Sequence, residues 1–418
     1  MTTRLAPLFI AAFLSALSTA AANRIDPSTL NGKVLLGYQG WFSCPGDGSP
    51  HNNWRSWSRG VPAPDTLTVD LYPDLTELDA DERCAVPGMT IGGKPAYLYS
   101  AWRRKTVLRH FAWMKRYGLD GVLVQRFVGS IPDKRATGDV VLKNVIAGAE
   151  AYGRTFAIEY DISGGNPATF AQTIRDDWKY LVDDLHVTAS PSYQRHNGKP
   201  VVSVWGMGLD EPGHPPADAA AAKDLIQWFE SKAQVTYIGG VPSRWRTLTN
   251  DARKDDAWAA TFQAMNVIQP WTVGRYRDNA SADRWKDEML TPDLAQTARN
   301  SQLYMPVIFP GFSWHNLKPK SPPNQIPRHR GEFLWRQAYN ARVAGAVALK
   351  IAMFDEVNEG TAIFKVASKR RDAPDQGFWL TLDADGADLP SDWYLKLAGK
   401  ITRMFHGEIA PSPQMPLH

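Results

Sequence analysis

The chain has 418 residues, with 47 Lys and Arg against 43 Asp and Glu, and a formal net charge of +4. Because the basic residues are scattered, the sequence shows no electrostatic footprint for nucleic acid, and we expect no nucleic-acid partner. This length is long for one ordinary domain but normal for an α/β barrel with insertions. Tryptophan, at 16 residues, is as common as phenylalanine, which suits both packed cores and the stacking of indole faces on sugar rings.

The N-terminus has the pattern of a signal peptide over residues 1–22. Arg4 gives a positive start, residues 5–17 form a short apolar run, and residues 20–22 are small alanines suited to cleavage. No later stretch approaches the roughly 18 apolar residues of a membrane-spanning helix. We therefore expect a protein secreted to the extracellular space or periplasm, monomeric, with no membrane anchor after signal cleavage.

Short β-branched and apolar runs alternate with longer segments of helical periodicity along the remaining chain. The expected strands are residues 33–37, 121–125, 155–160, 200–204, 235–239, 266–270, 303–309 and 346–353. The expected helices are residues 105–117, 140–152, 167–184, 217–232, 252–264, 293–300, 331–344 and 391–404. Eight β/α units predict an α/β fold, a (β/α)8 TIM barrel spanning residues 23–407, followed by a flexible tail at 408–418. The dinucleotide-binding pattern GxGxxG, which would favour an open sheet, is missing.

A long segment rich in Gly, Pro, Asp and Trp, residues 41–101, follows the first expected strand. This long β1–α1 loop insertion is predicted to lie at the catalytic end of the barrel, as a lid or cleft wall. It contains both cysteines of the chain, Cys44 and Cys84. In an oxidising compartment such a pair favours a disulfide, and two buried free thiols are the alternative.

In barrels of this kind the residues after each strand build the active site. This rule selects residues rich in aromatic rings and carboxylates, and poor in nucleophile–base pairs of the Ser/His type. The candidates for substrate binding are Tyr38, Trp41, Gln125, Arg126, Asp161, Trp205, Trp271, Trp314 and Asp355. Each has a structural alternative, because tryptophans at strand ends also pack cores, and Asp161 or Glu159 could form an ion pair with Arg126.

The stretch MFDEVNEGTAIF, residues 353–364, follows the last expected strand and places Glu356 three residues before Glu359. Carboxylates at this spacing share a face if the chain begins a helical turn. Two carboxylates at a strand mouth are the minimum equipment for acid/base cleavage of a glycosidic bond, provided that one stays protonated near neutral pH. An exposed helix start, which also favours acidic residues, is the alternative.

This stretch resembles the strand-8 motif of glycoside hydrolase family 99 endo-α-mannosidases, a WNEWHEGT-type sequence with two glutamates before Gly-Thr. Residues 37–42, GYQGWF, and the approach to the fourth strand at 193–202 also resemble the family 71/99-like barrels. The resemblance spans roughly residues 34–403. Here Phe354-Asp355 replaces Trp-Asn and Val357-Asn358 replaces Trp-His. These changes alter the walls of the sugar site, so mannose specificity does not carry over.

The resemblance implies a glycoside hydrolase that acts within an α-linked polysaccharide or oligosaccharide, and the signal-peptide pattern implies that it is secreted. By position, Glu356 would be the base that acts on the 2-hydroxyl of the sugar, giving a 1,2-anhydro sugar and net retention, and Glu359 would be the general acid/base. The related family 71 glucanases invert instead, with one carboxylate activating water. No cofactor and no metal are expected, because the sequence lacks a Cys or His cluster with metal-ligand spacing.

Two other readings stay open from the sequence. The first is a lectin-like barrel, which keeps aromatic platforms for a glycan but does not cleave it. The second is a barrel with metal- or phosphate-dependent chemistry, although the loops after the last two strands lack a Gly-rich phosphate cradle.

Overall fold

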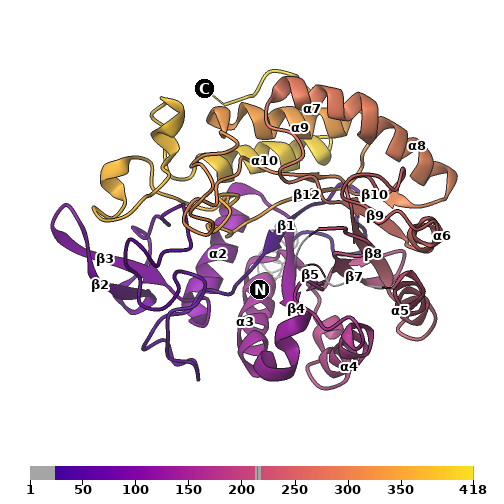
Figure 1. The fold of residues 1–418 in the computed structure, drawn as a ribbon, viewed down its shortest axis with the longest axis horizontal. Coiled ribbons are helices and arrows are strands. Elements are labelled where there is room, and N and C mark those ends of the chain that lie inside the picture. Colours follow the sequence, from indigo (N-terminus) through magenta and orange to yellow (C-terminus); the bar gives the residue numbers. More distant parts are fainter. Residues whose placement is uncertain (1–23, 212–213, 215–217, 418) are drawn as a thin grey trace, which may run out of the picture.

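The computed structural model describes residues 24–211, 214 and 218–417. Its centre is a parallel sheet whose strands form a ring inside a layer of helices (Figure 1). Around the ring, the strands are β1 (Val34–Tyr38), β4 (Gly121–Phe127), β5 (Thr155–Asp161), β7 (Lys199–Trp205), β8 (Thr236–Val241), β9 (Val267–Pro270), β10 (Leu303–Tyr304), β11 (Val307–Ile308) and β12 (Leu349–Ile351), and β12 pairs with β1. Every expected strand is present, and the predicted (β/α)8 barrel is confirmed.

The seventh strand of the barrel is broken into two pieces. β10 pairs with β9, and β11 pairs with β12. Pro306 lies between the two pieces, and it has no N–H group to donate to a neighbouring strand. Its carbonyl still accepts a hydrogen bond from the Lys350 N–H, at 3.0 Å. The chain itself therefore bridges the gap where the ring of strands closes.

Eight helices lie where the sequence predicts them, between the strands and after the last strand: α2 (Arg104–Tyr117), α3 (Ile131–Tyr152), α4 (Phe170–Asp183), α5 (Ala219–Ser231), α6 (Ala257–Gln263), α8 (Thr291–Arg299), α9 (Glu332–Val343) and α10 (Trp393–Phe405). The first of them ends at Gly118 with φ of 72°, the left-handed cap that its glycine predicts. The boundaries of three helices are corrected. α6 begins at Ala257 rather than 252, since Ala252 forms a β-bridge with Leu209. α3 begins at Ile131 rather than 140, across a kink at Lys134. α4 begins at Phe170 because Asn166 accepts from the Ala168 N–H in a turn instead of capping the helix.

Several elements were not expected from the sequence. The long β1–α2 segment contains an antiparallel hairpin, β2 (Arg83–Ile91) and β3 (Lys94–Tyr99), which lies outside the ring beyond α2 (Figure 1). A short strand, β6 (Arg195–His196), pairs with β7, and α7 (Asn279–Trp285) precedes α8. The minor helices are η1 (Ala80–Glu82), η2 (Val128–Ser130), η3 (Val187–Ala189), the π-helical η4 (Lys286–Leu290), η5 (His329–Gly331), η6 (Arg370–Asp372) and η7 (Leu382–Asp385).

A disulfide between Cys44 and Cys84 joins the start of the long segment to β2, with the Cα atoms 6.4 Å apart. The predicted disulfide is thus confirmed. Trp57 is fully buried in the same segment, with its ring centroid 4.0 Å from that of Phe42 and 5.0 Å from that of Tyr99. The segment is therefore a covalently closed, packed wall rather than a loose loop.

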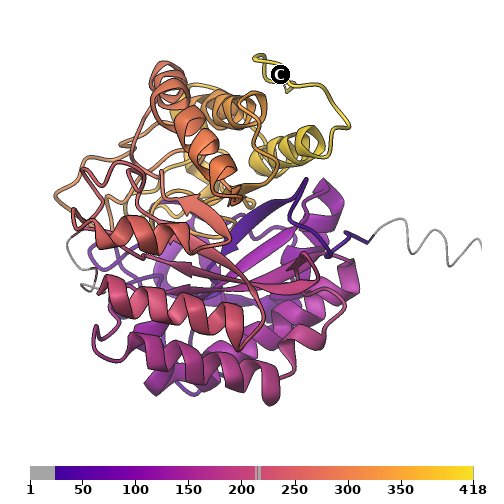
Figure 2. The ribbon, with the colours of Figure 1, turned by 90° about the vertical axis from the view of Figure 1, so that its right-hand side faces the viewer.

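The two ends of the chain differ in what the structure describes. The expected signal peptide, residues 1–22, lies outside the described residues. At the other end, the Ser412 carbonyl accepts from Trp335 Nε1 at 2.9 Å, and Met415 packs against the core. Figure 2 shows this end beside the C-terminal helices. The flexibility expected for residues 408–418 stays a prediction.

Within the described ranges, no helix is both long enough and apolar enough to cross a membrane.

Candidate active site

The two glutamates of the strand-8 motif lie in the loop after β12, at the C-terminal end of the barrel. Glu356 is 6% exposed, and its Oε2 accepts from Gln39 Nε2 at 3.0 Å. Glu359 is half-buried, and no residue in the described parts of the chain forms a hydrogen bond or ion pair with its carboxylate. Burial, followed by repulsion from Glu359, raises the pKa of Glu356 well above its usual value.

Burial also raises the pKa of Glu359, to about 7, and repulsion from Asp161 and Glu211 adds to the effect. Like charges that share a buried site cannot easily ionise together, so the pair of glutamates titrates as a unit. Near neutral pH the pair can therefore hold a proton ready for donation. This is the protonation state that an acid/base catalyst needs.

Asp161 is the third carboxylate at the mouth, at the end of β5. It is 8% exposed and accepts from the Ser163 N–H at 2.7 Å and from the Ser163 hydroxyl. Burial raises its pKa to about 6. Since its charge raises the pKa of both glutamates, the structure brings Asp161, Glu356 and Glu359 into one electrostatic cluster.

Asp355 lies beneath this cluster and is fully buried. One carboxylate oxygen accepts from the Gln39 N–H at 2.7 Å, and the other accepts from the Gly40 N–H at 2.9 Å. Burial raises its pKa to about 6. Asp355 thus joins the loop after β12 to the loop after β1 and places Gln39 against Glu356, with both carboxylate oxygens already engaged.

A buried polar network fills the barrel interior. Gln125, Glu159 and Ser203 stand opposite one another on β4, β5 and β7. Glu159 accepts from Gln125 Nε2 at 2.7 Å and from Ser203 Oγ at 2.8 Å. Lys350 Nζ lies 2.5 Å from Glu159 Oε1 and 3.3 Å from Gln269 Oε1. Gln125 points into the barrel interior, where its partner belongs to this network, which the sequence analysis missed.

Two predicted site residues face the helices instead of the mouth. Tyr38 is fully buried, with its hydroxyl 3.0 Å from His110 Nδ1. Arg126 donates to both carboxylate oxygens of Asp177, at 2.6 and 2.7 Å, and lies 3.0 Å from Asp139. The ion pair considered between Arg126 and Glu159 or Asp161 is therefore wrong. Because neighbouring strand residues point to opposite faces, Tyr38 and Arg126 are not brought to the carboxylates.

The four predicted tryptophans follow different strands. Trp205 and Trp271 meet edge to face with ring centroids 5.2 Å apart, and Lys350 Nζ lies 5.6 Å from the ring centroid of Trp271. Trp314 contacts Phe312. The indole Nε1 atoms of Trp41, Trp205 and Trp314 are buried and, among the described residues, have no hydrogen-bond partner. A buried donor without a partner is costly unless a ligand or water completes it.

The long β1–α2 segment holds the loops at the barrel mouth. Asp70 accepts from Ser313 Oγ at 2.5 Å and from the His315 N–H at 2.8 Å, both in the loop after β11. Its own N–H donates to the Val357 carbonyl at 3.0 Å, and Asn358 Nδ2 donates to the main chain of the segment. Asp70 was missed, although a lone carboxylate in the apolar stretch 67–72 is a signal, because buried charges are costly unless they are bonded.

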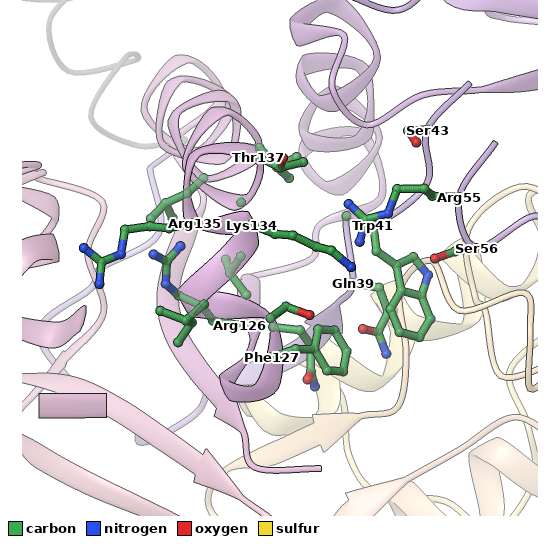
Figure 3. Close-up of a pocket in the computed structure, with 18 of the residues that line it drawn as sticks. Gln39, Trp41, Ser43, Arg55, Ser56, Arg126, Phe127, Lys134, Arg135 and Thr137 are labelled. Carbon is green, nitrogen blue, oxygen red and sulfur yellow. The ribbon is translucent and has the colours of Figure 1, made fainter. Parts of the chain in front are cut away.

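A cavity of about 410 Å³ lies between the loops after β1 and β4 and the start of α3 (Figure 3). Its lining includes Gln39, Trp41, Arg55, Phe127 and Lys134, but neither catalytic candidate. Trp41 stacks on Phe127 with ring centroids 5.1 Å apart. Gln39 connects the two places, because its side chain lines the cavity and bonds to Glu356. The cavity therefore adjoins the carboxylates, and we assign the chemistry to the carboxylates rather than to the cavity.

Over the part of the chain that the structure describes, one group of acidic residues is compact enough to share a metal ion: Asp79, Asp81 and Glu82. Lys105 Nζ lies 2.7 Å from Asp79 and 2.9 Å from Asp81, and Arg109 lies 2.5 Å from Glu82. These carboxylates are thus neutralised by lysine and arginine and lie in the long segment, at η1. The mouth carboxylates do not form such a group.

Comparison with known proteins gives matches in structure. No family model matches the sequence, and no curated protein matches it. The GH99 endo-α-mannosidase from Bacteroides thetaiotaomicron is similar to this chain with a TM-score of 0.65 and 17% identity, over 91% of this chain and 99% of that one. Its complex with Bis-Tris-propane gives a TM-score of 0.64 and 16% identity, with the same coverage.

A third solved structure, described as a glycoside hydrolase-like protein, has a TM-score of 0.52 and 14% identity, over 83% of this chain and 98% of that one. Sequence identities this low support a similarity in fold and nothing beyond it. The resemblance drawn from the strand-8 motif is confirmed at that level: the chain has the TIM-barrel fold of the family 99 glycoside hydrolases.

Proposed function

We propose that the protein is a secreted glycoside hydrolase that cleaves within an α-linked polysaccharide or oligosaccharide. Glu359 is the general acid/base, and Glu356 is the base. The observation that carries the proposal is the pair itself: one buried and one half-buried carboxyl after β12, whose pKa values are both raised and neither of which forms an ion pair among the described residues. Strongly shifted groups in such a position are typical of acid/base catalysts.

In the proposed reaction, protonated Glu359 gives its proton to the oxygen of the departing sugar as the glycosidic bond breaks. Glu356, held by the Gln39 amide, accepts a proton on the other side of the reacting carbon. If that proton comes from the 2-hydroxyl, a 1,2-anhydro sugar forms, and water activated by Glu359 then opens it with net retention. If the proton comes from water, water attacks directly and the anomeric configuration inverts.

The likeness in fold to endo-α-mannosidases supports internal cleavage of an α-linkage. It does not support mannose as the sugar, because Phe354 and Val357 replace tryptophans of the family motif. Trp41, Trp205, Trp271 and Trp314 are the proposed platforms for sugar rings. Gln125 and Asp161 are proposed to contact hydroxyl groups, and Gln125 Oε1 is buried with no partner in the described parts of the chain.

Export is the second part of the proposal. The signal-peptide pattern at residues 1–22 supports it, and the disulfide between Cys44 and Cys84 is the kind of bond that persists in oxidising compartments. Expression of the full chain followed by N-terminal sequencing of the exported protein tests cleavage after residue 22. Light scattering on the same sample tests the expectation of a monomer.

A panel of α-linked polysaccharides, followed by NMR during digestion, tests the activity and gives the linkage and the anomeric outcome together. The wild-type chain is expected to release reducing ends from at least one polymer. Glu359→Gln should abolish that release, while Glu288→Gln, an exposed glutamate on η4, should leave it unchanged.

Release by Glu359→Gln at the wild-type rate would remove Glu359 from the mechanism. Binding of a glycan without any release would favour the lectin-like alternative. Loss of activity after chelation would favour metal-dependent chemistry.

A further inference from the structure

Two cations in the cavity beside Glu356 have no acidic partner. Arg55 from the long segment and Lys134 from α3 point into the cavity toward Trp41 (Figure 3). Across the described residues, neither side chain forms a hydrogen bond or an ion pair, and none of the residues that line the cavity is acidic. Lys134 is exposed, as a lysine without an ion-pair partner commonly is, whereas Arg55 is half-buried, and a charge at that depth is normally paired.

The other arginines of the cavity wall show the contrast. Arg126 is bound to Asp177 and Asp139, and Arg135 lies 3.5 Å from Asp177. Figure 3 shows the guanidinium groups of both directed away from Trp41. The positive charge at Arg55 and Lys134 is therefore not part of the ion-pair network that joins β4 to α3 and α4.

The local electrostatics agree with this arrangement. Burial lowers the pKa of the half-buried Arg55. Burial and repulsion from Arg55 and Lys134 lower the pKa of His51, whose Nε2 lies 2.9 Å from Thr137 Oγ1 at the cavity wall. Arg55 and Lys134 therefore disfavour the charged form of His51, and Asp47, the carboxylate that opposes them, is bonded to Ser49 and Ser100. A bound anion would remove the repulsion.

We propose that this cavity binds an acidic group, a carboxylate or a sulfate ester, on a sugar unit next to the bond that Glu356 and Glu359 cleave. The substrate is then an anionic glycan. The inference rests on the proposed function, which gives the position of the cleaved glycosidic bond. Gln39 connects the cavity to that position. Gln39 Nε2 bonds to Glu356, while its Oε1 is buried with no partner in the described chain and can accept from a sugar hydroxyl.

The chemistry of the two side chains fits such a ligand. A guanidinium presents a planar fork that matches the oxygens of a carboxylate or sulfate, and an ammonium adds a point charge. Trp41 Nε1, a buried donor without a partner among the described residues, lines the same space. The stacked Trp41 and Phe127 provide an apolar wall for the sugar ring.

Binding in the absence of turnover tests the inference. The full chain carrying Glu359→Gln is titrated by tryptophan fluorescence with α-1,4-linked oligogalacturonate and with its carboxyl-reduced form. A sulfated α-linked fucan oligosaccharide and its desulfated form make the second pair. At least one acidic glycan should bind about tenfold more tightly than its neutral counterpart. The pair that shows the difference identifies carboxylate or sulfate.

Substitutions assign the preference to the two cations. Arg55→Met and Lys134→Met, each added to Glu359→Gln, should remove most of the tighter binding of the acidic glycan. Arg55→Lys should retain part of that preference. Lys143→Met, an exposed lysine on the same helix α3, should leave it intact. Raising the salt from about 0.05 M to about 0.5 M should weaken it.

Equal binding of acidic and neutral forms in both pairs, or a preference that survives both methionine substitutions, overturns the inference. Neither result bears on the cleavage of neutral polymers, which the digestion panel measures separately. A clear acidic preference in a chain that cleaves nothing on the panel would instead support the cavity and contradict the proposed hydrolase.

Discussion

Buried carboxylates in this barrel fall into two groups that differ in their partners. Glu159 in the interior lies against Lys350, and Asp177 in the helix layer lies against Arg126. At the mouth, Glu356 has only the neutral Gln39 amide, and Glu359 has no hydrogen-bond partner within the described ranges. The chemical group is the same, and the difference is whether a cation forms an ion pair with it.

This contrast distinguishes carboxylates that stabilise the fold from carboxylates that can take part in the reaction. A buried carboxylate that forms an ion pair with a lysine or arginine joins strands and helices, and removal of its partner is strongly destabilising. At the mouth, burial raises the pKa values of Glu356, Glu359 and Asp161, and the charges of Lys318 and Lys350 offset this only in part at Glu359 and Asp161. The raised pKa values of these mouth carboxylates let them exchange a proton near neutral pH. We therefore place the reaction at the barrel mouth, next to the interior network of Glu159 and Lys350.

The largest expected effect is on the base at the mouth. Glu356→Gln should lower kcat by about 10³-fold, because a positioned acid or base typically contributes 10²- to 10⁴-fold. The Gln39 contact can persist with the amide, so KM should change little. Initial rates on the polymer identified by the panel measure this, with Glu288→Gln as the matched control. A kcat within a few-fold of wild type would place the base elsewhere.

Breaking the interior pair should affect stability rather than chemistry. Lys350→Met leaves Glu159 buried without its cation, and we expect it to lower the free energy of unfolding by about 3 kcal/mol. Urea unfolding measures the loss. The double variant Lys350→Met with Glu159→Gln should recover most of it, because no uncompensated charge is left. Equal losses in the single and double variants would show that packing, not charge, dominates at Lys350.

Breaking the ion pair between Arg126 and Asp177, which faces the helix layer, should affect stability less. Arg126→Met should cost about 2 kcal/mol of folding stability, because Asp177 keeps the Tyr160 hydroxyl, at 2.9 Å, and Arg135 as partners. The KM of the folded variant should equal that of wild type. Unfolding curves and Michaelis kinetics on the same sample separate the two effects. A raised KM at unchanged stability would return Arg126 to the substrate site.

The smallest expected effect is the dependence of stability on pH. The unpaired carboxyls have folded-state pKa values above their usual ones, with Asp161 and Asp355 at about 6 and Glu359 at about 7. From about pH 4 to 7 the folded chain therefore binds more protons at these groups than the unfolded chain, and these groups lower the stability as the pH rises.

Glu359→Gln should remove part of this slope and raise the free energy of unfolding at pH 8 by about 1 kcal/mol, a value reduced for its partial exposure. Urea unfolding at pH 5 and pH 8 measures it. A Glu359→Gln variant that is less stable than wild type at pH 8 would indicate that the carboxylate has a stabilising partner.

The strands could be predicted from the sequence because each is an apolar run buried on both faces. The hairpin of β2 and β3 could not, because β2 contains Pro87 and Gly88 and its pairing with β3 shifts register after Ala85. The broken seventh strand was predicted as one run, and only its pairing shows that β10 and β11 contact different neighbours.

The candidate site was predicted in place but not in detail. In the adjacent pair Tyr38 and Gln39, only Gln39 faces the barrel mouth. In the adjacent pair Gln125 and Arg126, only Gln125 faces the barrel interior. The period of two along a strand states that both members of a pair cannot point inward, so this error was avoidable. The contact of Asp70 with the loop after β11 was not predictable in the same way, because it joins segments that are far apart in the sequence.

The most direct test of the central claim is the leaving-group dependence of Glu359→Gln. Its rate is measured on the polymer that the panel identifies and on the glycosyl fluoride of the same sugar, whose leaving group needs little protonation. If Glu359 is the acid, the variant should lose about 10³-fold or more on the polymer and less than about tenfold on the fluoride. Equal losses on both substrates would contradict the assignment of Glu359 as the group that protonates the departing sugar.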